Sequence, residues 1–117
     1  MLKVYAYAKC DTCRKALKFL RANEIAFEEV AIRETPPSKP ELRTMLAAQE
    51  GELRKLFNTS GGDYKALGLS AKLPGLDVEE ALDLLAANGN LVKRPFAIAD
   101  DVHLVGFDEA RWRAALA

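Results

Sequence analysis

The hydrophobic period of this chain changes abruptly near residue 10, and this change restricts the fold more than any other feature. Residues 2–7 are mostly apolar or aromatic, which predicts a short strand. From Asp11 onward apolar residues recur at helical spacing, which predicts a helix ending near Asn23; they are Cys13, Ala16, Leu17 and Leu20. Cys10 and Cys13, the only cysteines among 117 residues, therefore lie at a strand-to-helix junction.

A second strand and a helical middle are predicted next. Residues 25–32 are rich in β-branched and aromatic side chains, which favours a strand. Capping boxes at Ser38–Glu41 and Asp77–Glu80 each predict the start of a helix, and Asn88-Gly89 predicts the end of the later one. The expected buried faces are Leu42, Met45 and Leu46 in the first helix and Val78, Leu82 and Leu85 in the second.

Strands return in the last third of the chain. Phe96–Ala99 and Val102–Val105 flank an Asp100-Asp101 turn, which predicts an antiparallel hairpin. Asp108 is positioned to cap a last helix, and Trp112 fits the buried face of that helix.

The element order β-α-β, helices, β-β-α predicts the α/β class. A helix between the first two strands implies a right-handed parallel crossover, so we expect a small mixed sheet flanked by helices. The length suits one domain over residues 1–117, with a helical subdomain at about 38–90.

Composition excludes several classes of protein. Half of the residues are hydrophobic and 29% are charged, as in ordinary globular proteins. Seventeen basic and seventeen acidic residues balance, whereas a nucleic-acid or membrane binder would usually carry a positive excess. The apolar runs are short, and the N-terminal residues lack the pattern of a signal peptide. We therefore expect a cytoplasmic protein.

The position of the cysteines predicts an activated thiol. Unpaired N–H groups and the dipole at a helix start stabilise a thiolate, so the pKa of Cys10 should be low. Lys9 and Arg14 should lower this pKa further, while Asp11 should oppose them. The spacing i, i+3 brings the sulfur of Cys13 within reach of a disulfide, so one thiol can attack and the other can resolve.

Two alternatives remain for the cysteine pair. A zinc site needs four ligands, and the chain offers one histidine, His103, and no second cysteine pair. The cysteines could otherwise be inert core residues, but the strand-to-helix junction favours redox chemistry. We expect no bound metal, and we expect His103 to be a structural surface residue.

Arg94-Pro95 is a further local signal. Pro95 begins the third predicted strand, and proline is the residue that takes a cis bond at low cost. Pro95 could instead be an ordinary proline at the start of a strand, and Arg94 an exposed arginine with no role in a site.

Three segments resemble the thioredoxin-like family that contains glutaredoxin-coupled arsenate reductases and the Spx-type regulators: YAKCDTCRKAL, RETPPSKPEL and LVKRPFAI. The resemblance covers nearly the whole chain. It implies a thioredoxin-like fold with a helical insertion between the second and third strands.

The resemblance also implies roles for single residues. Cys10 corresponds to the catalytic or sensing thiol, Arg94 to the arginine that contacts oxyanions or sulfur species, and Pro95 to a cis-proline. Asp11 and Thr12, between the cysteines, would support the site. The electron donor would be glutathione with glutaredoxin, or thioredoxin, and no cofactor would be bound.

This chain departs from the arsenate reductases at two of their three oxyanion-binding arginines. The second would fall at Asn58 or Ser60, according to the branch aligned, and the third near Gly106. Each lost arginine removes charged hydrogen bonds of about 1.5–3 kcal/mol. We therefore expect weak arsenate reduction, with Asn58 and Ser60 supporting the site.

The leading prediction is a monomeric thiol-dependent oxidoreductase that acts on a small oxyanion or thiol. Cys10 would be the nucleophile, and Cys13 or an external thiol would resolve the intermediate on Cys10. The alternative is an Spx-type regulator that binds the RNA polymerase α subunit through a Cys10–Cys13 redox switch. That branch has a glycine where this chain has Glu52, an arginine where it has Ser60, and a longer tail than one ending at Ala117.

Overall fold

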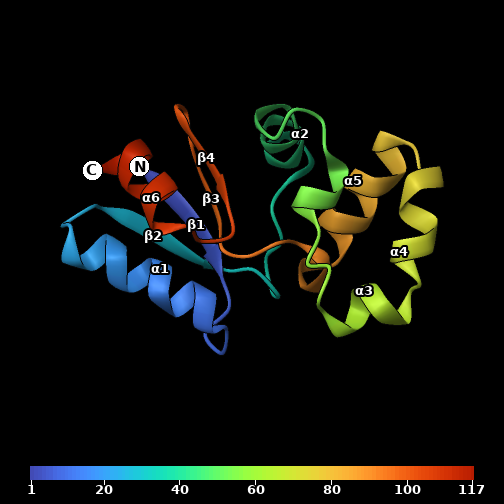
Figure 1. Cartoon of the computed structure of the whole chain (residues 1–117), viewed down its shortest axis with the longest axis horizontal. Coiled ribbons are helices and arrows are strands. Elements are labelled where there is room, and N and C mark those ends of the chain that lie inside the picture. The colour runs from blue at the N-terminus through green and yellow to red at the C-terminus, as the bar shows by residue number, and fades with distance from the viewer.

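The computed structural model describes residues 1–117 and contains a four-stranded mixed sheet (Figure 1). Its strands, in the order β2-β1-β3-β4, are β1 (Leu2–Ala6), β2 (Phe27–Ala31), β3 (Phe96–Ala99) and β4 (Val102–Val105). β1 pairs with β2 in parallel and with β3 antiparallel, while β3 and β4 form an antiparallel hairpin. The predicted crossover, hairpin and mixed sheet are confirmed.

Two helices, α1 (Asp11–Ala22) and α6 (Glu109–Leu116), cover one face of this sheet (Figure 1). The core between helices and sheet includes Val4, Leu17, Leu20, Ala97, Leu104 and Trp112. The indole Nε1 of Trp112 donates to the carbonyl oxygen of Gly106 at 3.0 Å, so the buried ring keeps its hydrogen bond. The core position predicted for Trp112 is confirmed.

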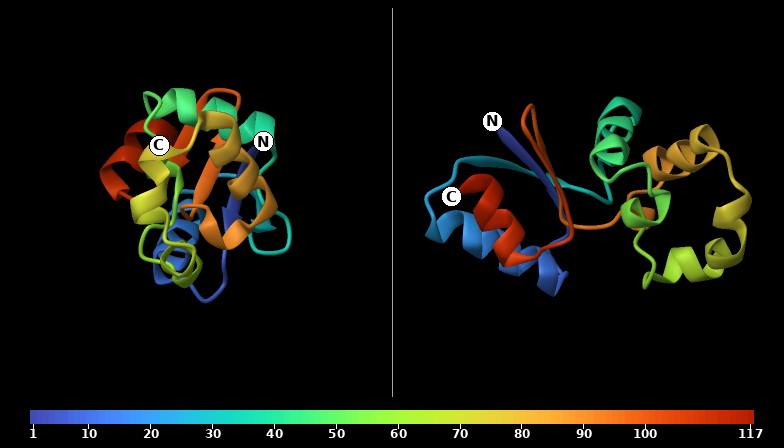
Figure 2. Two further views of the ribbon diagram at one scale, coloured as in Figure 1. Left: turned by 90° about the vertical axis from the view of Figure 1, so that its right-hand side faces the viewer. Right: turned by 45° about the horizontal axis from the view of Figure 1, so that its top comes forward.

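A helical insertion between β2 and β3 packs against the other face, to which Tyr5, Phe96 and Ile98 point. Its elements are α2 (Lys39–Ala48), η1 (Leu53–Leu56), α3 (Gly62–Ala66), α4 (Leu69–Lys72), η2 (Leu73–Gly75), α5 (Val78–Ala87) and η3 (Gly89–Leu91). Figure 2 (right) shows the insertion beside the sheet, with both chain termini on the sheet side. No helix of the chain has the length and apolar character that crossing a bilayer would require.

The predicted helix starts are confirmed, but the predicted burial of one residue is wrong. Both capping boxes form, at Ser38 and Asp77, and Asp108 caps α6. Val78, predicted to face inward, is 43% exposed; Ala81 is buried instead. Val78 is the first residue of α5, where the side chain lies outside the packed face. The short helices α3 and α4 were not predicted, because neither carries a side-chain cap.

The chain returns to the sheet through a segment that is fixed by backbone hydrogen bonds. Asn58 donates its N–H to the Leu91 carbonyl at 2.7 Å, and Lys93 donates to the Leu56 carbonyl at 2.8 Å. These bonds hold η1 against the residues just before β3. The Arg94–Pro95 peptide bond that follows is cis, as the family resemblance implied.

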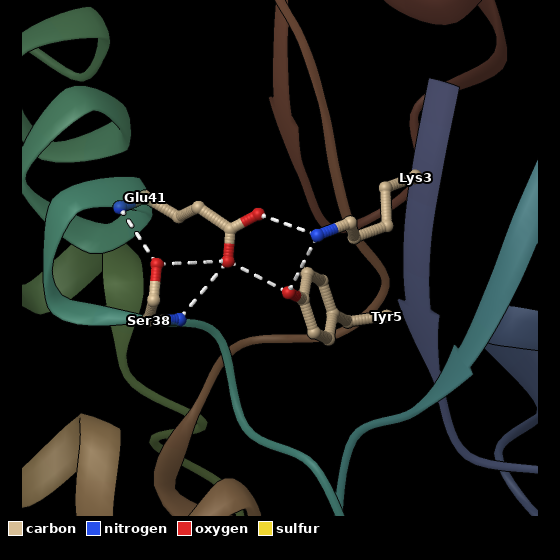
Figure 3. Close-up of polar contacts among 4 residues, drawn as sticks. All are labelled: Lys3, Tyr5, Ser38 and Glu41. Atoms are coloured by element: carbon tan, nitrogen blue, oxygen red, sulfur yellow. Dashed lines mark hydrogen bonds and ion pairs between the residues drawn. The ribbon is translucent and has the colours of Figure 1, made fainter. Parts of the chain in front are cut away.

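A partly buried polar network joins β1 to the start of α2 (Figure 3). Tyr5 donates its hydroxyl to Oε1 of Glu41 at 2.7 Å, and Lys3 Nζ lies 3.1 Å from Oε2. Oε1 also accepts from the backbone N–H of Ser38 at 3.0 Å, so the capping box of α2 is tied to the sheet. Burial opposes ionisation of Glu41, but hydrogen bonds from Tyr5 and Ser38 outweigh it and lower the carboxyl pKa.

Tyr5→Phe should lower the free energy of unfolding by about 1–2 kcal/mol, because it removes a hydrogen bond to a charged, partly buried acceptor. The contribution of Glu41 is present above its ordinary pKa of 4.5 and is lost as pH falls through the lower folded value. The penalty should therefore shrink in acid. Urea unfolding at neutral and acid pH measures both effects.

Tyr64→Phe is the matched control, since Tyr64 is also buried but its hydroxyl makes no hydrogen bond within the chain. It should change stability little. Equal losses in the two variants would show that the network in Figure 3 adds no stability.

Candidate active site

Cys10 lies between β1 and α1 and is the N-cap of the helix. Its backbone is extended, with φ −98° and ψ 118°, and its Sγ accepts a hydrogen bond from the N–H of Cys13 at 3.4 Å. Both cysteines are free thiols; Cys10 is half-buried and Cys13 is fully buried. The predicted placement of one thiol at the helix start and the other a turn inside is confirmed.

The two thiols differ in acidity. Burial alone would raise the pKa of Cys10, but hydrogen bonds from the thiol and the N–H of Cys13, together with Arg94, bring it below the ordinary 9.0. Burial raises the pKa of Cys13, and the neighbouring Cys10 raises it further. Cys10 is therefore the thiol that ionises first.

After the hydrogen bonds from Cys13, the positive charge of Arg94 also lowers the pKa of Cys10. Arg14 donates from Nη1 to Oδ1 of Asp11 at 3.2 Å and from Nε to the Ala8 carbonyl at 3.0 Å. The opposing effects expected of Arg14 and Asp11 thus cancel within one exposed ion pair. Thr12 is exposed and forms no side-chain hydrogen bond within the chain.

Tyr7 is the residue around which the site is assembled, and sequence reasoning missed it. Its ring centroid lies 5.0 Å from Cζ of Arg94 and 4.9 Å from Cζ of Arg33. Its hydroxyl accepts a hydrogen bond from Nη1 of Arg33 at 2.8 Å, and its carbonyl accepts from the N–H of Cys10 at 3.0 Å. Tyr7 reads as an ordinary strand residue and Arg33 as a loop charge, so no local signal marks either.

Asn58 and Ser60 belong to a neighbouring polar cluster. Ser60 Oγ lies 3.5 Å from Oδ1 of Asn58, and Asn58 Nδ2 lies 3.5 Å from the Asn90 carbonyl. Asp63 accepts hydrogen bonds from the side chains of Asn88 and Asn90, which lower its pKa, and Arg33 lowers it further. None of the hydrogen bonds of Asn58 or Ser60 reaches a cysteine or Arg94, and their support of the site stays a prediction.

The third oxyanion-binding arginine of arsenate reductases would fall near Gly106, where the backbone conformation favours glycine. Gly106 has φ +68°, in the left-handed region that side chains rarely adopt. A Cβ there would come within 3.2 Å of Cε of Lys93. The N–H of Gly106 donates to the carbonyl of the cis residue Pro95 at 2.9 Å, so this glycine shapes the backbone beside Arg94.

The chain brings together no group of three histidine, cysteine or acidic side chains that could hold a metal ion. His103, the one histidine, lies half-buried on β4, in register with Ile98 of β3.

Iodoacetamide should alkylate Cys10 well before Cys13, and at a lower pH, because only the thiolate reacts. Labelling of Cys10 should be half-maximal below pH 9.0, whereas buried Cys13 should label only at higher pH or after unfolding. Arg94→Ala should raise the apparent pKa of Cys10, since it removes a nearby positive charge. Peptide mass spectrometry across pH measures each rate, and faster labelling of Cys13 would reverse the assigned roles.

Comparison with known proteins agrees with this geometry. A model of the ArsC family matches residues 5–115. The uncharacterized protein YusI of Bacillus subtilis (strain 168) is 44% identical over 108 residues, which are 92% of each chain. The global transcriptional regulator Spx 1 of Lactococcus lactis subsp. lactis (strain IL1403) is 32% identical over 99% of this chain and 89% of its own.

A solved structure is also similar. The crystal structure of "a possible arsenate reductase" from Streptococcus mutans UA159 superposes with a TM-score of 0.86 and 40% identity. The match covers 92% of this chain and 91% of the other. The thioredoxin-like fold and its helical insertion are thus shared with solved relatives.

Proposed function

The chain belongs to the ArsC family, and we propose that it is a thiol-dependent oxidoreductase with Cys10 as nucleophile and Cys13 as resolving thiol. The observation that carries this proposal is the placement of Cys10 at the N-cap of α1, where Arg94 and the N–H of Cys13 lower its pKa. A lower pKa raises the fraction of thiolate, which is the nucleophile in thiol–disulfide exchange.

The first step is attack of the Cys10 thiolate on one sulfur of a substrate disulfide. A new S–S bond forms as the old one breaks, and the leaving thiolate takes a proton from solvent. Arg94 is placed to stabilise negative charge near the sulfur, whether on a sulfenate, a carboxylate of glutathione or an oxyanion.

The second step is attack of Cys13 on the Cys10 sulfur, which releases the reduced substrate and leaves a Cys10–Cys13 disulfide. The charge and hydrogen bond of Cys10 help raise the pKa of Cys13, and both effects disappear once Cys10 is covalently bonded. Cys13 thus becomes more acidic when it is needed, although burial still opposes its ionisation. An external thiol, glutathione with glutaredoxin or thioredoxin, then reduces the disulfide.

Arsenate is a poor candidate substrate for this site. Of three arginines expected in an oxyanion cradle, only Arg94 is present, and the φ of Gly106 disfavours a side chain at the third place. Without the charged hydrogen bonds of the missing arginines, worth about 1.5–3 kcal/mol each, binding should be weak.

A turnover assay with glutathione and glutaredoxin tests the proposal, using arsenate in one arm and a glutathione mixed disulfide in the other. Steady reduction of the disulfide with little or no arsenate turnover is expected. No turnover of either substrate, with glutaredoxin or with thioredoxin, would contradict the enzymatic proposal.

A redox-sensing regulator is the second candidate, because the match to Spx 1 runs over 99% of this chain. In that role the Cys10–Cys13 pair would act as a switch, and the protein would bind the α subunit of RNA polymerase. A pull-down with the C-terminal domain of that subunit separates the two functions. Binding that changes with oxidation favours the regulator.

A further inference from the structure

Two arginines that lie far apart in the sequence share the ring of Tyr7. Cζ of Arg94 and Cζ of Arg33 each lie about 5 Å from its centroid, and Arg33 also donates to its hydroxyl. Arg94 extends the positive charge toward Cys10, and Arg33 extends it toward the hydroxyl end of the ring. The two cations therefore border one aromatic platform beside the reactive thiol.

Neither of these arginines is neutralised by an acidic partner. Four other arginines form ion pairs with carboxylates, namely Arg14, Arg21, Arg43 and Arg113. Arg33 and Arg94 form none, which is also true of Arg54 and Arg111, and Arg33 lowers the pKa of Asp63 from a distance. Oδ2 of Asp63 already accepts hydrogen bonds from Asn88 and Asn90.

The backbone that carries Arg33 is fixed by the fold. Ile32 just before it is fully buried, and its N–H donates to the Ala6 carbonyl at 3.0 Å. Gly89 of η3 packs so closely on the other side that a Cβ there would lie 3.1 Å from Cα of Arg33. Arg33 is exposed, but its backbone is held between β1 and η3. Its guanidinium is held by the hydrogen bond to Tyr7, so it moves less freely than an ordinary surface charge.

We propose that Arg33 is a second cationic arm of the Cys10 site and binds a carboxylate of the disulfide whose sulfur Cys10 attacks. This rests on the proposed redox function of Cys10. A guanidinium has five N–H donors, so the bond to Tyr7 leaves others free for a carboxylate. With one guanidinium near Cys10 and the other at the ring hydroxyl, the site suits a ligand whose sulfur and carboxylate lie at separate ends, more than a compact oxyanion.

The test compares three short aliphatic disulfides that differ in their terminal group and its charge: anionic dithiodipropionate, neutral hydroxyethyl disulfide and cationic cystamine. A Cys13→Ala background retains the mixed disulfide on Cys10, where intact-mass measurement gives its rate of formation. Once each rate is divided by the rate of the same disulfide with a free thiol, which corrects for the leaving thiol, the anionic disulfide should react fastest. Its advantage over the neutral one should fall as salt is added, because the charges are exposed to solvent.

Arg33→Gln should lower the ratio of anionic to neutral rates by about three- to tenfold, with little change in the rate for the neutral disulfide. Arg33→Lys should retain much of the preference because it keeps the charge. Arg43→Gln, which removes an exposed arginine on α2, should change nothing.

An unchanged ratio in Arg33→Gln would overturn this inference and leave the proposed function intact. Equal losses in Arg33→Gln and Arg43→Gln would also overturn it, since they would reflect net charge alone. Failure of all three disulfides to react with Cys10 would remove the proposed function, and this inference with it.

Discussion

Thiol–disulfide exchange by this chain should fall by about a thousandfold or more when Cys10 is replaced by serine. A serine hydroxyl does not ionise near neutral pH, so neither the N-cap hydrogen bond nor Arg94 can turn it into a comparable nucleophile. The fold should be retained, because Cys10 is only half-buried and serine is a good N-cap residue. The rate of mixed-disulfide formation with a glutathione disulfide measures the loss.

Cys13→Ala is the matched control, and it should block the second step of the exchange, not the first. Attack by Cys10 should continue, but the mixed disulfide should accumulate, because no internal thiol releases it. In the unsubstituted chain diamide should produce an intramolecular Cys10–Cys13 disulfide, seen as a loss of two hydrogens in one peptide. Retained exchange in Cys10→Ser together with its loss in Cys13→Ala would exchange the roles of the two thiols.

The features that sequence predicted correctly depend on short-range signals. The caps at Ser38, Asp77 and Asp108 each involve a residue three positions ahead, so their pattern is complete within one turn of helix. The N-cap position of Cys10 followed from the change of hydrophobic period around it. The cis bond at Pro95 and the importance of Arg94 came from family resemblance, since the local sequence also fits an ordinary strand start.

The features that sequence could not predict depend on contacts between distant segments. Arg33 and Arg94 meet at Tyr7 only because the sheet aligns β1, the end of β2 and the start of β3. The ion pair of Arg14 with Asp11 is local, whereas the contact of Arg94 with Cys10 joins residues far apart in the sequence. The position of a charge along the sequence is thus a poor guide to which cation lies near a thiol in the fold.

Gly89 shows how a correct local prediction can rest on the wrong cause. Asn88-Gly89 was expected to end α5, and α5 does end at Ala87. A glycine after a helix usually takes a left-handed conformation, but Gly89 has no positive φ. The reason for glycine is distance: a Cβ would lie 1.8 Å from the carbonyl oxygen of Ile32 and 2.7 Å from its carbonyl carbon.

Gly89→Ala should therefore destabilise the fold by about 3 kcal/mol or more, because both atoms that the new methyl meets are backbone and cannot rotate away. The nearby Ile32 carbonyl precedes Arg33, so surviving folded protein should also lose preference for anionic disulfides. Chemical unfolding gives the first effect and the rate ratio gives the second.

Gly75→Ala is the control for the general effect of adding a methyl group to a glycine. No atom lies within 4 Å of a Cβ at that position and its φ is not positive, so stability should change by less than about 1 kcal/mol. A Gly89→Ala variant as stable as Gly75→Ala would mean that η3 can move away from Ile32. The backbone of Arg33 would then be free to move, and the two-arginine platform on Tyr7 would lose the support that the fold gives it.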